Sequence, residues 1–200
     1  MKRILVCGIG TDVGKTLVSA ILVKALGAHY WKPVQAGGLD ESDSHTVKRL
    51  VPETVCYPEA YRLRHPLSPH HAAALEKIEL NPEAFRIPAS SCPLVIEAAG
   101  GILVPFRSDQ LLVNLYLQWD CDWIVVSRHY IGSINHTLLT LEALQRRKVR
   151  LLGIIFNGTE QLHTEQAIFA CTGVPILSHL YPEAKWTPSL VQRYAHTWKL

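Results

Sequence analysis

The sequence has 200 residues, of which 48% are hydrophobic and 18% are charged, and its formal net charge is +3 at pH 7. This size fits one compact domain with a buried core, and the composition is that of a globular chain, which excludes disordered and coiled-coil proteins. The longest basic run is Arg146–Lys148, so the charge gives no support for binding to nucleic acid.

The most informative motif lies at the N-terminus. An apolar strand is predicted over Arg3–Cys7, glycines follow it, and Gly14-Lys15-Thr16 leads into an apolar helix predicted over Thr16–Leu26. In a strand, turn and helix of this kind, backbone N–H groups and Lys15 bind phosphates, and the Thr16 hydroxyl can hold Mg²⁺. The motif therefore predicts a P-loop for a nucleoside triphosphate.

The spacing of this motif departs from the common pattern. Five residues separate Gly8 from Gly14, one more than in the usual P-loop. The alternative is an ordinary glycine-rich turn with a surface lysine. Thr11 and Asp12 inside the loop place a hydroxyl and a carboxylate beside the phosphates, which suggests that the loop handles something besides the nucleotide.

A strand rich in aromatic residues is predicted next, over His29–Val34, followed by a loop over Gln35–Ser44 and a helix that ends near Leu50. Residues 51–91 contain six prolines and one firm helix, Ser68–Lys77. We therefore expect 51–91 to be an irregular insertion over one edge of the sheet, and residues 1–200 to form a single domain.

Strands and helices alternate regularly from residue 93 onward. Strands are predicted over Pro93–Glu97, Trp123–Val126, Arg150–Phe156 and Pro175–Leu180, and helices over Asp109–Trp119, Ser133–Arg146, Thr164–Cys171 and Ser189–Trp198, with a loop over Ala98–Arg107. Alternating elements with buried strands predict an α/β fold of the P-loop NTPase type, with three layers and a mostly parallel sheet covered by helices on both faces.

Four polar residues lie at the predicted strand ends or helix starts, where such sheets bind their ligands. Glu97 and Lys32 end two strands, Asp43 opens a helix and Asn157 ends another strand. Glu97 and Asp43 can organise Mg²⁺, and Lys32 can neutralise a second anionic group besides the triphosphate. Each has a plainer alternative: a strand end facing water for Glu97 or Lys32, and a helix cap for Asp43.

Asn157 also has two possible roles. Its amide could bind adenine, or Asn157 and Gly158 could simply make the turn that this pair favours.

The remaining composition points to a reduced, intracellular environment. Five cysteines without close pairs are expected to be reduced and mostly buried, and ten histidines lack metal-ligand spacing, which leaves Mg²⁺ as the expected metal. We expect no signal peptide, and Lys24 interrupts the longest apolar helix, so we expect no membrane span and a cytoplasmic protein.

Several motifs in order resemble the dethiobiotin synthetase family over nearly the whole chain. They are Gly8–Thr16, Trp31–Val34, Ser42–Asp43, Leu67–His70, Ile96–Gly101 and Gly132–His136. The resemblance implies an ATP-dependent ligase of biotin synthesis that converts CO₂ and 7,8-diaminononanoate into dethiobiotin, ADP and phosphate. It also implies a homodimer in which the helix start at 132–135 receives the substrate carboxylate across the interface.

The resemblance further implies roles for individual residues. Lys15, Lys32 and Thr11 are implied in catalysis, and Thr16, Asp43 and Glu97 in binding Mg²⁺. The nucleotide is implied to contact Asp12, Val13, Gly14, Lys15, Thr16, Leu17, Asp43, Glu97, Ala98, Ala99, Gly100, Asn157, Gly158, Leu180, Tyr181 and Pro182, and the substrate Ala36, Ser133, Ile134 and Asn135.

Departures from the family pattern and local alternatives stay open at this point. Ala36 stands where a serine contacts substrate, Asp12 where a glutamate is common, and Ala98 where glycine is usual. The helix start at 132–135 could be capped by Ser133 instead of binding an anion. Two other functions compete. One is another P-loop ligase or kinase that acts on an amine or carboxylate, such as a relative of ATP-dependent amidases. The other is a catalytically silent regulatory module or a nucleotide switch of the partition-ATPase type, and such switches normally carry another lysine early in the loop.

Overall fold

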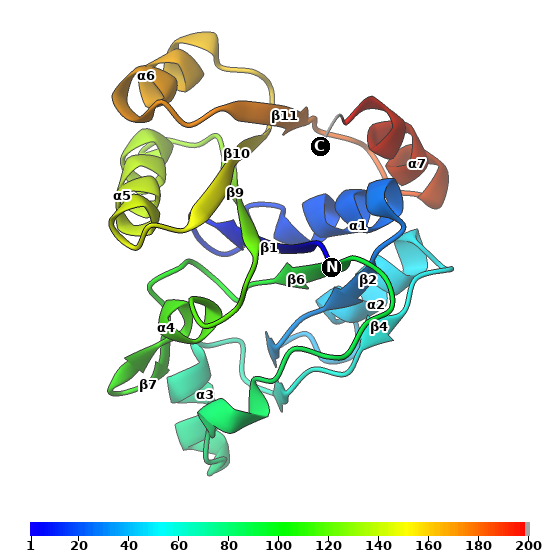
Figure 1. Cartoon of the computed structure of the whole chain (residues 1–200), viewed down its shortest axis with the longest axis vertical. Coiled ribbons are helices and arrows are strands. Elements are labelled where there is room, and N and C mark those ends of the chain that lie inside the picture. The colour runs from blue at the N-terminus through cyan, green and yellow to red at the C-terminus, as the bar shows by residue number, and fades with distance from the viewer. Residues whose placement is uncertain (199–200) are drawn as a thin grey trace.

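The computed structural model of the protein describes residues 1–198, and its centre is a seven-stranded sheet (Figure 1). The strand order is β11-β10-β9-β1-β6-β2-β4, and every pairing in this sheet is parallel. The strands are β1 (Arg3–Gly8), β2 (His29–Trp31), β4 (Cys56–Tyr57), β6 (Leu94–Glu97), β9 (Asp122–Arg128), β10 (Arg150–Asn157) and β11 (Ile176–Leu180).

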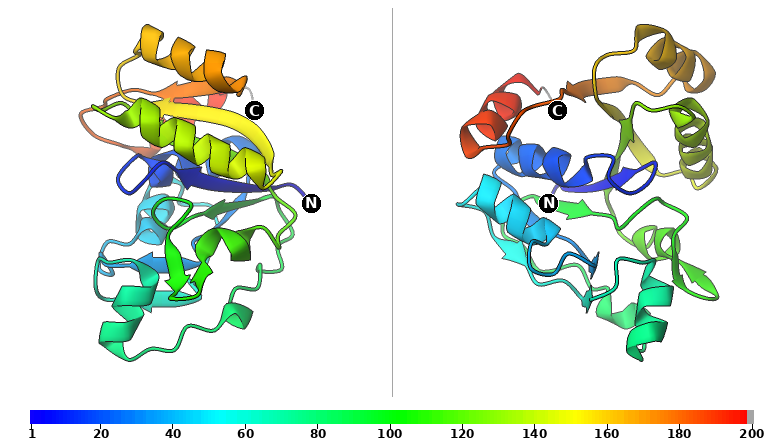
Figure 2. Two further views of the ribbon diagram at one scale, coloured as in Figure 1. Left: turned by 90° about the vertical axis from the view of Figure 1, so that its left-hand side faces the viewer. Right: turned by 180° about the vertical axis from the view of Figure 1, so that it is seen from behind.

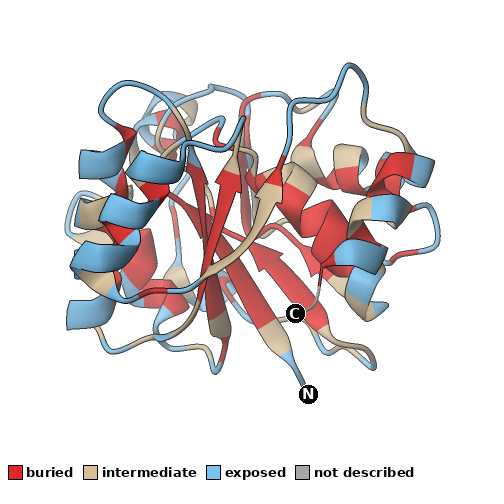
Figure 3. Ribbon diagram, turned by 90° about the horizontal axis from the view of Figure 1, so that it is seen from above, coloured by how far each residue is buried: buried red, intermediate tan, exposed pale blue. Residues whose placement is uncertain are grey.

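Helices cover both faces of the sheet (Figure 2). One face carries α1 (Lys15–Leu26), α2 (Asp43–Leu50) and α7 (Pro188–Thr197), and the other carries α4 (Leu112–Tyr116), α5 (Ser133–Arg146) and α6 (Leu162–Thr172). Successive side chains of a strand point to opposite faces. Ile4 and Val6 therefore belong to the hydrophobic core on the side of α1, α2 and α7, and Leu5 and Cys7 belong to the core on the side of α4, α5 and α6. The predicted three-layer α/β fold is confirmed, and its central strands β1, β6 and β9 are mostly buried (Figure 3).

The predicted strand over His29–Val34 is wrong in its second half. β2 ends at Trp31, and β3 (Val34–Ala36) pairs instead with β5 (Tyr61–Leu63) in a separate two-stranded parallel sheet. Pro33 lies at the break because it has no N–H to donate to a strand ladder. The break leaves Lys32 between the two sheets, at the carboxyl end of the main one.

The predicted helix over Asp109–Trp119 starts later than expected. β7 (Pro105–Arg107) and β8 (Gln110–Leu111) form an antiparallel hairpin, and α4 begins only after it. In the hairpin turn, the Arg107 guanidinium donates to the Asp109 carboxylate over 3.2 Å, which favours the turn over a helix start. Part of the predicted loop at 98–107 is therefore strand β7.

Residues 51–91 carry more strand than the sequence predicted. They contribute β4 as the edge strand of the main sheet and β5 to the smaller one, together with α3 (Pro69–Glu76) and a short 3₁₀ helix (Pro82–Ala84). The firm helix predicted here is present within one residue of its predicted limits. It begins after Ser68, with Pro69 in its first turn.

The cysteines are all free, but fewer are buried than predicted. Only Cys7 and Cys121 are buried, whereas Cys171 is exposed on α6. None of the helices in residues 1–198 combines the length and the apolar character that crossing a membrane requires.

Candidate active site

A cleft of about 730 Å³ lies at the carboxyl ends of the central strands. Since all strands of the main sheet run the same way, the residues that follow β1, β2 and β6 meet at this edge. The cleft is lined by Thr11, Asp12, Gly14, Lys15, Thr16, Leu17, Lys32, Val34, Gln35, Ala36, Asp43, Pro66, Leu67, Ser68, Pro69, Glu97, Ala99, Gly100, Val104 and Asn157.

The predicted P-loop forms one wall of the cleft and joins β1 to α1. Gly14 caps α1 in a left-handed conformation (φ 102°), and a Cβ there would lie 2.6 Å from Asn157 Nδ2, so only glycine fits. No side chain caps this helix start, so its N–H groups and helix dipole are available to an anion. The Lys15 ammonium donates to Gly10 O over 2.7 Å and lies across the loop.

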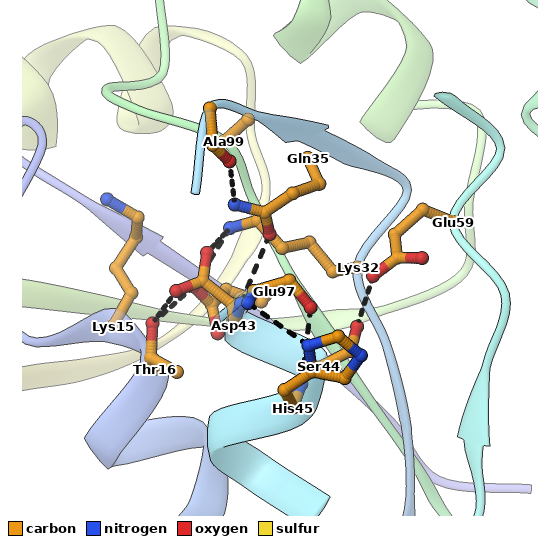
Figure 4. Close-up of polar contacts among 12 residues, drawn as sticks. Lys15, Thr16, Lys32, Gln35, Asp43, Ser44, His45, Glu59, Glu97 and Ala99 are labelled. Atoms are coloured by element: carbon orange, nitrogen blue, oxygen red, sulfur yellow. Dashed lines mark hydrogen bonds and ion pairs between the residues drawn. The ribbon is translucent and has the colours of Figure 1, made fainter. Parts of the chain in front are cut away.

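Beside the start of α1, four side chains from different segments meet in one charged cluster (Figure 4). Lys32 Nζ lies 2.5 Å from Asp43 Oδ2 and 3.0 Å from Glu97 Oε1. Thr16 Oγ1 lies 2.7 Å from Asp43 Oδ1 and 3.0 Å from Glu97 Oε1. The structure thus brings together the predicted phosphate-binding helix, both predicted acids and the second lysine.

Burial and pairing together set the charges of this cluster. Lys32 is 5% exposed and Glu97 is 1% exposed. Burial alone would lower the pKa of Lys32, but Glu97 and Asp43 raise it above its ordinary value, so Lys32 is an ammonium. Burial alone would likewise raise the pKa of Asp43, yet Lys32 and the Thr16 hydroxyl hold it below its usual range. The plainer alternatives of water-facing ends for Lys32 and Glu97 are therefore wrong.

Lys15 and Tyr30 complete the surroundings of the cluster. Burial lowers the pKa of Lys15, although the nearby Glu97 opposes that effect. The Tyr30 hydroxyl donates to Glu97 Oε2 over 2.8 Å, and burial, followed by the charge of Glu97, raises its pKa well above the ordinary value. Tyr30 is therefore neutral, and it holds Glu97 by donating a hydrogen bond to it.

The oxygen atoms of this cluster fit Mg²⁺. Thr16, Asp43 and Glu97 offer one hydroxyl and two carboxylates, which are the hard ligands that Mg²⁺ prefers. Within residues 1–198, no group of three or more His, Cys, Asp or Glu side chains could hold a metal by itself. The protein would therefore supply only part of the coordination shell, as is usual for a Mg²⁺ ion that also binds nucleotide phosphates.

Some predicted site residues do not line the cleft. Val13 and Ala98 are buried behind its wall, and Leu180 is buried beside Gly14, while Tyr181 is partly exposed. The N–H of Gly158 donates to Leu180 O over 2.9 Å, so the ends of β10 and β11 are joined next to the P-loop.

Asn157 does something that neither predicted role anticipated. Its amide donates to Val13 O over 2.9 Å and so ties the end of β10 to the P-loop. Asn157 also lines the cleft, and its contact with adenine stays a prediction.

The predicted substrate residues of α5 lie away from the cleft. Gly132 caps this helix with φ 96° and without any side-chain hydrogen bond, so the alternative in which Ser133 caps it is wrong. Instead, the Ser133 carbonyl accepts from Thr137 Oγ1 over 2.6 Å. Asn135 is exposed, Ile131 is fully exposed and Ile134 is 39% exposed.

Two parts of the site were missed from the sequence. The buried Gln35 accepts from the Asp43 N–H over 3.2 Å and donates to Gly37 O over 2.9 Å, which fixes the start of α2. Residues 66–69 form the far wall of the cleft. The Leu67–His70 motif was the available signal for this wall, but no site role was predicted for it.

Known proteins resemble the chain in sequence and in fold. A family model described as an AAA domain matches residues 2–189. Proteins named ATP-dependent dethiobiotin synthetase BioD from Chlamydia felis and Chlamydia pneumoniae are 43% and 44% identical to the chain, over 98% and 100% of it and 94% and 90% of their own lengths. The relative of the same name from Cytophaga hutchinsonii is 46% identical over 98% of the chain and 96% of its own length.

Solved structures share the fold at low sequence identity. The cell division ATPase MinD of Pyrococcus furiosus matches 98% of both chains with a TM-score of 0.60 and 15% identity. A ParA family ATPase from Chlorobium tepidum also matches 98% of both chains, with a TM-score of 0.54 and 13% identity. These two similarities support the P-loop ATPase fold alone, whereas the sequence similarity to the curated relatives extends over nearly their whole length. The chain belongs to the dethiobiotin synthetase family.

Proposed function

We propose that this protein is an ATP-dependent dethiobiotin synthetase of biotin biosynthesis. It converts ATP, CO₂ and 7,8-diaminononanoate into dethiobiotin, ADP and phosphate, and it acts in the cytoplasm as a single P-loop domain. The observation that carries the proposal is the charged cluster of Lys32, Asp43, Glu97 and Thr16, which lines the same cleft as the P-loop. The names of relatives that are 43–46% identical support the same activity.

The chemistry requires two anions to be held side by side. One substrate amine attacks CO₂ and forms a carbamate, and a carbamate oxygen then attacks the γ-phosphorus of ATP, from which ADP leaves. The second amine attacks the carbonyl carbon of the resulting anhydride, the ring closes and phosphate departs with the carbamate oxygen. Both the carbamate and the triphosphate are negatively charged, so their approach needs fixed positive charge.

The two lysines divide this task. Lys15 and the N–H groups at the start of α1 bind the phosphates, because these groups lie at the P-loop. Lys32 lies beyond Thr16 and stabilises the carbamate together with the hydroxyl of Thr11, which also lines the cleft. Thr16, Asp43 and Glu97 hold Mg²⁺, which supplies neutralising charge to the phosphate chain.

In the proposed complex, the base of the nucleotide, the rest of the nucleotide and the diamine contact different parts of the chain. We infer that the base binds near Asn157, Gly158 and Leu180–Pro182, at the joined ends of β10 and β11. The remaining nucleotide contacts fall to Asp12, Val13, Gly14, Leu17 and Ala98–Gly100, around the P-loop. Ala36 lines the cleft and offers a methyl group to the diamine in place of a hydroxyl.

We infer that the carboxylate end of the diamine binds across a homodimer interface. Ser133, Ile134 and Asn135 lie outside the cleft of their own chain, and the start of α5 has free N–H groups without a side-chain cap. An uncapped helix start attracts a carboxylate. The exposed Ile131 and Ile134 beside it support contact with a second copy of the chain.

Phosphate release from ATP should require both bicarbonate and the diamine. In a ligase, the carbamate must form before phosphoryl transfer can occur, so ATP alone should give at most a small background. A continuous phosphate assay that omits each substrate in turn measures this requirement. Full-rate phosphate release without the diamine would instead favour a nucleotide switch.

Lys15→Ala and Lys32→Gln should separate nucleotide binding from chemistry. Lys15→Ala removes the phosphate-facing charge and should abolish detectable binding of a non-hydrolysable ATP analogue in calorimetry. Lys32→Gln keeps a donor toward Glu97 but loses the charge, so it should bind the analogue within about threefold of wild type while turnover falls about a hundredfold. Loss of analogue binding in the Lys32→Gln protein would contradict this division of roles.

Hybrid dimers test the composite site. Asn135→Asp places a negative charge beside the proposed carboxylate and should raise the KM for the diamine about tenfold without changing that for ATP. Mixing Asn135→Asp with Lys15→Ala should restore part of the activity, because one of the two sites in a hybrid dimer then has both intact parts. An unchanged diamine KM, or no recovery although subunits exchange, would remove α5 from the site.

A further inference from the structure

A buried carboxylate outside the cleft, which has no role in the proposed reaction, joins three segments of the chain. Glu165 of α6 is 5% exposed and is not among the residues that line the cleft. It accepts hydrogen bonds from His129 Nε2 over 2.8 Å, from His179 Nε2 over 2.9 Å and from the N–H of Gln161 over 3.2 Å. These donors follow β9, lie in β11 and precede α6, respectively.

Four aromatic rings stack beside this carboxylate, from the end of β9 to the residue after β11. The centroids of His129 and Phe156 are 5.0 Å apart with the rings 9° from parallel. Phe156 and His179 follow at 6.1 Å and 24°, and His179 and Tyr181 at 6.0 Å and 22°. The stack ends at Tyr181, which is 43% exposed and whose hydroxyl bonds Glu160.

The hydrogen bonds of this cluster also act on the ionisation of Glu165. Burial alone would raise the pKa of Glu165, but the hydrogen bonds from His179, Gln161 and His129 hold it below its usual range. His129 Nδ1 is buried and has no hydrogen-bond partner among the described residues. A proton on Nδ1 would leave a buried donor unpaired, so the geometry favours the tautomer of His129 that carries its proton on Nε2 and donates it to Glu165.

The cluster also connects directly to the strand ends beside the P-loop. The N–H of His129 donates to Asn157 O over 3.0 Å, and the N–H of Gly158 donates to Leu180 O over 2.9 Å. Asn157 in turn donates to Val13 O in the P-loop. Glu165 therefore holds the chain on both sides of the segment at which the nucleotide base is proposed to bind, without itself lying in the cleft.

We propose that Glu165 is a positioning residue for the base end of the nucleotide site, where it fixes Asn157, Gly158 and Tyr181 through His129 and His179. The proposal rests on the proposed function, since it needs ATP to bind at the P-loop. It predicts that Glu165 governs how much the adenosine part adds to affinity. The triphosphate part, which contacts the P-loop and Lys15, should be insensitive to Glu165.

Inorganic tripolyphosphate separates the two ends of the nucleotide. Calorimetry with Mg²⁺ gives the affinity of each protein for a non-hydrolysable ATP analogue and for tripolyphosphate, which lacks the base. In Glu165→Gln, the single amide oxygen replaces two acceptor oxygens and the amide nitrogen faces a histidine donor. The analogue should then bind about tenfold more weakly, while tripolyphosphate binding changes by less than about twofold.

Matched variants keep this test decisive. Glu142→Gln makes the same chemical change at an exposed position of α5, where Glu142 pairs with Arg146, and should leave both affinities unchanged. His179→Leu removes one hydrogen bond to Glu165 at a partly buried position. It should likewise weaken binding of the analogue and not of tripolyphosphate, and it replaces Glu165→Gln in the test if that variant does not fold.

The results that would overturn the role of Glu165 are different from those that would overturn the proposed ligase activity. Equal losses for both ligands, or no loss for either, in the Glu165 and His179 variants would overturn the positioning role. The same holds if the wild type binds the analogue no more tightly than tripolyphosphate. If the wild type releases phosphate only with bicarbonate and the diamine, the proposed function stands whatever the variants do.

Discussion

The contacts of the Lys32 side chain with Asp43 and Glu97 are the interaction that joins three segments of the chain at the cleft. Both Lys32 and Glu97 are almost wholly buried, and an unpaired charge in such a place costs several kcal/mol, about 3–5 when one partner is lost. The end of β2, the start of α2 and the end of β6 must therefore meet at one point. Thr16 joins the same point from α1 and connects it to the P-loop.

The fold alone does not decide what this site does. MinD of Pyrococcus furiosus and the ParA family ATPase share the parallel sheet and its helices at 13–15% identity, and one fold commonly carries many functions. What bears on function is the position of charge in this chain. Between Gly8 and Gly14 there is no lysine, whereas a buried lysine at the end of β2 lines the same cleft as the loop. A second cation at that place suits an anionic acceptor for the γ-phosphoryl group.

Much of the site could be predicted because it follows from local sequence and one topological rule. The glycines before Lys15 define the loop, and the rule that parallel strands end at the same edge brings Lys32 and Glu97 to it. The helix over Ser133–Arg146 has the limits that its sequence predicted. Such features depend on residues that are neighbours along the chain or on the common direction of the strands.

The features that could not be predicted depend on where the chain turns. The expected strand breaks at Pro33, and the chain continues into a second small sheet, from which Gln35 contacts Asp43. The cluster around Glu165 joins residues 36 and 14 positions away along the chain, and no local pattern marks such a contact. A hairpin likewise takes the place of an expected helix start, and its turn contains the contact between Arg107 and Asp109.

The central claim is that a carbamate oxygen, and not water, receives the γ-phosphoryl group in this cleft. Turnover with ¹⁸O-enriched bicarbonate and CO₂ in ordinary water tests it directly, with the released phosphate analysed by mass spectrometry. Because ring closure breaks the bond between the carbonyl carbon and the phosphorylated oxygen, each phosphate formed together with dethiobiotin should carry one ¹⁸O atom from CO₂. Phosphate that carries none, although the remaining CO₂ is still enriched, would show that water is the acceptor and would contradict the ligase chemistry.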